Sequence, residues 1–190
     1  AAWTSYNDVS FAAGTWTLGS SITVADDLRI DTGDTLSSGN FDISVQGDWD
    51  NQGSYSSGTE TVTFTDSARS STITGSTSFA NLQVPSAAAG KTIYFQAGTT
   101  QTVTSDLTLT GSSGNEILLR STAPGAQWTI LNNTSTQDIS YVNVEDSNVD
   151  DASSGGDLLA AYSTDAGGND TTPSPAWNFN PTLTWTGATN

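Results

Sequence analysis

Two short stretches decide the fold: Phe41-Asp42-Ile43-Ser44-Val45 and, 20 positions further on, Thr61-Val62-Thr63-Phe64-Thr65. In each stretch apolar and polar side chains alternate, which is the period of a β-strand with one buried face. Similar alternating runs recur along most of the chain, separated by Gly, Asn and Asp, which favour turns. No long helical period interrupts these runs. The chain is therefore expected to be all-β.

The alternating runs also repeat at a longer spacing. The apolar positions Ile22, Ile43, Val62, Leu82 and Val103 lie 21, 19, 20 and 21 residues apart. Such a period is typical of the turns, or rungs, of a β-solenoid, because one rung cannot bury its apolar edge alone. We predict a parallel β-helix with rungs of about 20 residues in which these five side chains stack. An antiparallel sandwich is the alternative, but the Asn-Gly and Asp-Gly pairs of tight hairpins are absent from the sequence.

Composition supports strands and restricts the partners. Thr (31) and Ser (27) make up 58 of the 190 residues, and both disfavour helices. The net charge of −16 argues against nucleic acid and against anionic membranes as partners. Cys, His and Met are absent, so a metal ion would need carboxylate or carbonyl oxygens. No apolar run approaches the ~18 residues of a membrane span, so membrane insertion is not expected.

The two termini bear on location and domain organisation. The start, Ala1-Ala2-Trp3, carries the small residues that signal-peptide cleavage leaves, and the acidic, Lys-poor composition suits secretion. We therefore expect an extracellular or cell-surface protein. Residues 1–180 should form a single solenoid domain with a loop-rich C-terminal part, in which Trp177-Asn178-Phe179 closes the core. Residues 181–190 should form an extended tail or linker.

Several short motifs resemble a known type of repeat. They are Phe79-Ala80-Asn81-Leu82, Thr99-Thr100-Gln101-Thr102-Val103, Pro124-Gly125-Ala126-Gln127-Trp128-Thr129 and Ser140-Tyr141-Val142-Asn143-Val144. They resemble the repeat modules of large secreted bacterial proteins of the right-handed parallel β-helix type, the pectate-lyase-like surface or adhesin-type proteins. The resemblance implies a structural or adhesive role at the cell surface. It implies little about activity, because β-helices carry many functions.

Asp146, Asn148, Asp150 and Asp157 are candidate calcium ligands. They occupy positions one, three, five and twelve of a calcium-loop pattern, and hard oxygen donors suit calcium. Asp151 stands where such loops carry Gly, position twelve is Asp rather than Glu, and no flanking helices are expected. A solvated acidic loop is therefore the alternative.

Other patterns point to catalysis, ice binding or sugar binding. Neighbouring aspartates on a strand face opposite sides, so pairs such as Asp26-Asp27 do not form a catalytic dyad, and no enzyme is expected. The alternating threonines from Thr59 to Thr65 could order water, but such runs recur irregularly. Trp16, Trp49 and Trp128 lie inside strand patterns and are expected to pack in the core or at its edge.

Both ends carry strand-like segments that could mediate assembly. Val9 and Phe11 at one end, and Leu183 and Trp185 at the other, alternate with polar residues as an added strand requires. A solenoid exposes unpaired backbone at its ends unless it is capped, and no amphipathic cap is evident. We therefore predict a non-catalytic structural or adhesive module of an extracellular fibre, with copies joined head to tail. The alternative is a carbohydrate-binding or carbohydrate-acting β-helix, with surface polysaccharide as its partner.

Overall fold

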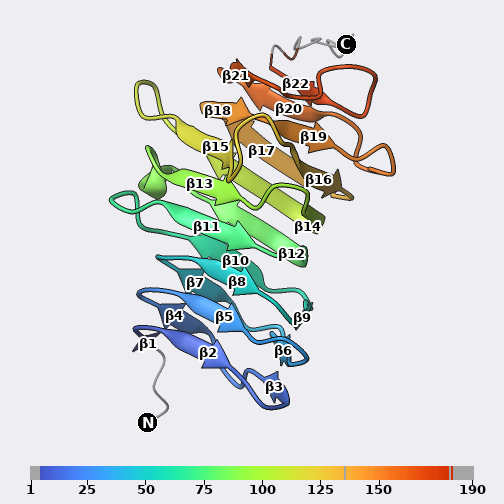
Figure 1. Ribbon diagram of the computed structural model, residues 1–190. Helices are drawn as coiled ribbons and strands as arrows, with labels where there is room; N and C mark the ends of the chain where they lie inside the picture. The colour runs from blue at the N-terminus through green and yellow to red at the C-terminus, as the bar shows by residue number, and fades with distance from the viewer. Residues whose placement is uncertain (1–4, 135, 180, 182–190) are drawn as a thin grey trace, which may run out of the picture.

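The computed structural model describes residues 5–134, 136–179 and 181, which form a parallel β-solenoid (Figure 1). Rungs of about 21 residues stack along one axis for about eight turns. Every pairing between two of its named strands is parallel. No helix in these residues is long and apolar enough to cross a bilayer. The all-β solenoid prediction is thus confirmed.

The strands form three faces. The first face contains β1 (Ser5–Tyr6), β4 (Ile22–Val24), β7 (Ile43–Val45), β10 (Thr61–Phe64), β12 (Thr77–Val84), β14 (Thr100–Thr110), β17 (Thr136–Ser140), β20 (Leu158–Ala161) and β22 (Trp177–Asn178). The second contains β2 (Val9–Phe11), β5 (Leu28–Ile30), β8 (Trp49–Asn51), β11 (Ser71–Thr74), β13 (Thr92–Phe95), β15 (Ile117–Ser121), β18 (Val142–Glu145) and β21 (Thr164–Gly167). The third contains β3 (Thr15–Thr17), β6 (Thr35–Ser37) and β9 (Ser54–Ser56). The first sheet also includes β16 (Trp128–Asn132), which pairs with β14, and β19 (Ser147–Val149), which pairs with β16. A 3-10 turn, Ser86–Ala88, precedes β13.

The long strands β12 and β14 turn the corner between two faces. The first part of β14 pairs with β16 and its last part pairs with β17. Between these parts Thr104, Ser105 and Asp106 are exposed. The corner lengthens the rung to 25 positions between the paired residues Leu82 and Leu107.

The predicted core stack is correct for four of its five members. Ile22 pairs with Ile43, Ile43 with Val62, and Val62 with Leu82, and all four are buried. The prediction for Val103 was wrong in register, because Val103 pairs with Phe79 although it is also buried. The alternation of apolar and polar residues correctly identified Val103 as an inward position. The residues added at the corner changed its partner, so that Leu107 rather than Val103 pairs with Leu82.

Carboxylates at one corner connect successive rungs. The Oδ1 atoms of Asp8, Asp27 and Asp48 accept hydrogen bonds from the backbone amides of Asp27, Asp48 and Thr72, at 3.2, 2.8 and 2.7 Å. Burial raises the pKa of Asp27; the Asp48 amide lowers it, while the nearby carboxylates of Asp48, Asp26 and Asp8 raise it further. These acidic turn residues therefore stabilise the stack as well as the turns.

The C-terminal part contains more strand than the sequence predicts. The sequence predicts a loop-rich C-terminal part, but residues 145–157 include β19 and residues 164–175 begin with β21. Both strands are short and flanked by Asp and Gly, which masks their pattern. The last described strand, β22, ends at Asn178, and nearly all of the predicted tail lies outside the described residues.

Candidate functional site

Each of the four cations already has acceptors. The three arginines form ion pairs: Arg29 with Asp31 and Asp50, Arg69 with Asp26, and Arg120 with Glu145 at 3.2 Å. The Nζ atom of Lys91 instead donates hydrogen bonds to the backbone carbonyls of Gln46, Asp66 and Arg69. These interactions leave most of the twenty carboxylates without a cationic partner among the described residues. The surface therefore favours neutral or cationic ligands over anionic ones.

Two buried ionisable groups belong to the scaffold. Lys91 is fully buried, and burial lowers its pKa to about 8, while the Asp66 carboxylate acts in the opposite direction. Glu60 is 1% exposed and accepts hydrogen bonds from the Ser38 hydroxyl at 2.7 Å and the Tyr55 hydroxyl at 2.6 Å. Burial also raises the pKa of Tyr55. These groups face backbone and side-chain partners in the interior, so their contacts hold the rungs together.

The predicted calcium ligands are tied to separate backbone groups. Asp146 is 7% exposed and its Oδ2 accepts the Gly125 amide at 2.7 Å. Asp150 accepts the amide of Ala152 at 2.7 Å and Asp157 that of Ala176 at 3.0 Å. Asn148 lies in β19, opposite Thr129 of β16. The extended strand thus separates Asp146 from Asp150.

A different acidic group comes together near the N-terminal end. Asp8, Asp26 and Asp27 each place a carboxylate oxygen within 4.8 Å of the others, which makes them the one such cluster in the part of the chain described. Asp26 also pairs with Arg69. Asp26 and Asp27 are neighbours in the chain and Asp8 joins them from the preceding rung, so the cluster is visible only once the rung register is known. Calcium binding at residues 146–157 stays a prediction.

The N-terminal end exposes side chains that continue buried rows. Trp16 pairs in register with Leu36 yet is 48% exposed, whereas Leu36 is fully buried. Tyr6, at 40% exposure, likewise pairs with buried Val24. Phe11 lies 6.3 Å from Trp16 between ring centroids. Of the three tryptophans expected in the core or at its edge, Trp16 lies at the edge, while Trp49 and Trp128 are fully buried.

The C-terminal end closes differently. Trp177 of β22 is 2% exposed, its indole N–H donates to the Ser147 hydroxyl at 2.9 Å, and its ring stacks on Phe179 at 5.8 Å. The expectation that this segment closes the core is therefore confirmed. Asp165 of β21 stands opposite buried Val144, so an exposed carboxylate occupies an inward position of the last rung. An inward charge at a sheet edge disfavours pairing with another chain.

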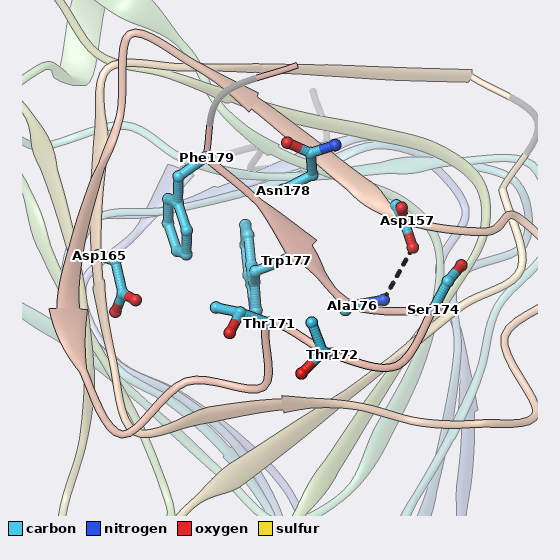
Figure 2. A pocket seen from close by; sticks show the side chains of 9 residues that line it. All are labelled: Asp157, Asp165, Thr171, Thr172, Ser174, Ala176, Trp177, Asn178 and Phe179. Atoms are coloured by element: carbon cyan, nitrogen blue, oxygen red, sulfur yellow. Dashed lines mark hydrogen bonds between the residues drawn. The ribbon is translucent and has the colours of Figure 1, made fainter. Parts of the chain in front are cut away.

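A hollow of about 550 Å³ lies at this C-terminal end (Figure 2). It is lined by Asp157, Asp165, Thr171, Thr172, Ser174, Ala176, Trp177, Asn178 and Phe179. Sequence reasoning missed it, because its wall from Thr171 to Ser174 has no repeating pattern. The aromatic pair that floors it was visible in the sequence as Trp177-Asn178-Phe179.

Comparison with known proteins adds no family to this description. No family model matches the chain, and no curated protein or solved structure matches it significantly. The fold defines the class, a parallel β-solenoid.

Proposed function

We propose that this chain is a non-catalytic structural or adhesive module of an extracellular surface fibre whose copies join head to tail. The observation that carries the proposal is the N-terminal rung, where Trp16 continues a buried row but is 48% exposed. Covering exposed aromatic surface of this kind with a partner removes it from water and so favours association. Strands β1, β2 and β3 each pair with one neighbour among the described strands. A further strand would extend the same parallel sheets.

The character of the two ends favours strand addition over end-on stacking of whole rungs. End-on stacking would bring the inward Asp165 of one copy against the apolar N-terminal rung of the next, which costs desolvation of a carboxylate. An added segment of alternating polar and apolar residues avoids this contact. Of the predicted assembly residues, Val9 and Phe11 lie in the N-terminal rung, whereas Leu183 and Trp185 lie outside the described residues.

The outer surface and the sequence resemblance also support this proposal. Outward positions such as Thr23, Ser44 and Thr63 form a row of small polar side chains along the first face. Such a surface keeps a rigid rod hydrated, and the high negative charge opposes unspecific association. The resemblance to secreted bacterial surface modules points to the same location.

Assembly can be tested by electron microscopy and sedimentation of the intact chain, of two deletions and of one point variant. We expect filaments from the intact chain, and none after deletion of residues 1–10, deletion of residues 181–190, or Trp16→Ser. Tyr94→Ser is the matched control, because Tyr94 is 38% exposed but lies on β13 in the middle of the rod. A monomeric intact chain at high concentration, or normal assembly by both deletions, would overturn the proposal.

A further inference from the structure

The hollow at the C-terminal end has the size of a small-ligand site. Its volume of about 550 Å³ falls in the range of roughly 300–1,000 Å³ that is usual for ligand pockets. Figure 2 shows Asp165 and Asp157 on opposite sides of it, with Trp177 and Phe179 between them. The loop residues Thr171, Thr172 and Ser174 complete the wall.

The lining combines an apolar ring with hydroxyl groups. Phe179 is half-buried and lies against Trp177, so Trp177 supports the ring that borders the hollow. Thr171, Thr172 and Ser174 are exposed and can both donate and accept hydrogen bonds. An apolar ring face beside several hydroxyls matches a sugar ring, which has an apolar C–H face and a polar rim.

Two carboxylates give the hollow a negative charge. Asp157 accepts the Ala176 amide through Oδ1 at 3.0 Å, and Asp165 accepts the Gly167 amide at 2.8 Å and the Asn169 amide group at 2.7 Å, also through Oδ1. Within the described residues the hydrogen bonds that hold these two carboxylates use Oδ1, which orients each group while Oδ2 can accept from a ligand. All four cations are engaged elsewhere. The charge of the hollow therefore favours an ammonium group and disfavours an acidic sugar.

We propose that this hollow binds a saccharide that carries a free amino group. The sugar ring packs on Phe179, its hydroxyls bond to Thr171 and Thr172, and its ammonium group pairs with Asp165 or Asp157. The hollow shares no residue with the N-terminal rung, and its binding is measured on the single chain, so this inference does not depend on the fibre proposal. It would give the module an adhesive surface.

Isothermal titration of the full chain tests the ligand class with three probes, at a pH where the amine is protonated. The probes are the β-1,4-linked disaccharide of glucosamine, its di-N-acetylated form, and putrescine, which carries ammonium groups without a sugar ring. We expect the amino disaccharide to bind at least about tenfold more tightly than either of the others, the scale of one charge-assisted contact. No measurable binding of the amino disaccharide, or equal binding of either other probe, would overturn the proposal.

Matched variants tie the binding to the hollow. Asp165→Asn and Phe179→Leu should each weaken the amino disaccharide about tenfold, since the first removes a charge and the second a ring face. Asp138→Asn makes the same charge change on the exposed surface of β17 and should leave binding unchanged. Phe179→Leu keeps an apolar cover over Trp177, and an unchanged melting temperature verifies the fold. Equal weakening by Asp138→Asn, or full binding by Asp165→Asn and Phe179→Leu, would contradict the assigned site.

Discussion

At the N-terminal end of the solenoid Trp16 is 48% exposed, whereas at the C-terminal end Trp177 is 2% exposed. Both residues extend rows of inward side chains, since Trp16 pairs with Leu36 and Trp177 pairs with Leu158. At the C-terminal end Phe179 stacks on Trp177 and Asp165 brings a charge to the inward position. Similar strand patterns therefore produce an apolar surface at one end and a covered, charged surface with a hollow at the other.

This difference is the basis on which we propose different functions for the two ends. An apolar end gains by burying more surface, so it suits a protein segment that adds a strand. A charged hollow with an aromatic floor suits a small polar ligand. Stacking of both ends in the same way would explain neither the charge of Asp165 nor the wall formed by residues 171–174.

Truncating the two tryptophans should give the largest difference between the ends. We expect Trp177→Ala to lower the free energy of unfolding by about 3–5 kcal/mol, the usual cost of removing a fully buried aromatic side chain. Trp16→Ala should cost only about 1 kcal/mol, because half of its surface is already hydrated. Denaturant unfolding of both variants, at concentrations where the chain is monomeric, measures the two costs. Equal costs would show that the N-terminal end is covered in solution.

The sequence predicts the solenoid well because alternation and the period near 20 report on local geometry and on stacking. It misplaces Val103 because period alone cannot tell which of two inward residues on β14, Val103 or Leu107, continues a given row. Nor can alternation show how an end is covered. Trp16 and Trp177 both have strand-like neighbours, and only the fold shows that Phe179 covers one of them.

The candidate site was less predictable than the fold for a related reason. The hollow depends on Asp165, which the sequence places in an apparent loop, and on the irregular segment from Thr171 to Ser174. The acidic cluster of Asp8, Asp26 and Asp27 arises from two successive rungs. Contacts of this kind follow from rung register, which a single sequence specifies only approximately.

A smaller effect on the free energy of unfolding is expected from Lys91. This residue lies between the two ends of the rod and so serves as an internal reference for both. Burial lowers the pKa of Lys91 from 10.5 to about 8, so between these pH values the unfolded chain binds more protons than the folded chain. The contribution of Lys91 to the free energy of unfolding should therefore rise as pH increases from about 8 to 10.5.

The measurement is the difference in unfolding free energy between the wild-type chain and Lys91→Met across this pH window. The same slope is expected in the Trp16→Ala and Trp177→Ala backgrounds, because Lys91 precedes β13 in the middle of the rod. If the pH dependence of this free-energy difference changed in one of the two backgrounds, that end would be energetically coupled to the interior. The two ends could then not be compared as independent parts of the rod.

Calcium should give the smallest effect, and it tests which part of the rod holds an ion. The spacing of Asp146, Asn148, Asp150 and Asp157 predicts that chelation lowers the melting temperature and that added calcium restores it, with about 2–4 °C for each 1 kcal/mol of binding energy. Replacing Asp146 and Asp150 together by Ala should abolish the response. A response that survives this change but disappears in Asp27→Asn would place the ion at the Asp8, Asp26 and Asp27 cluster, near the end that exposes Trp16. Calcium would then stabilise the rungs to which a neighbouring copy adds in the proposed fibre. An unchanged melting temperature on chelation would exclude calcium from both positions.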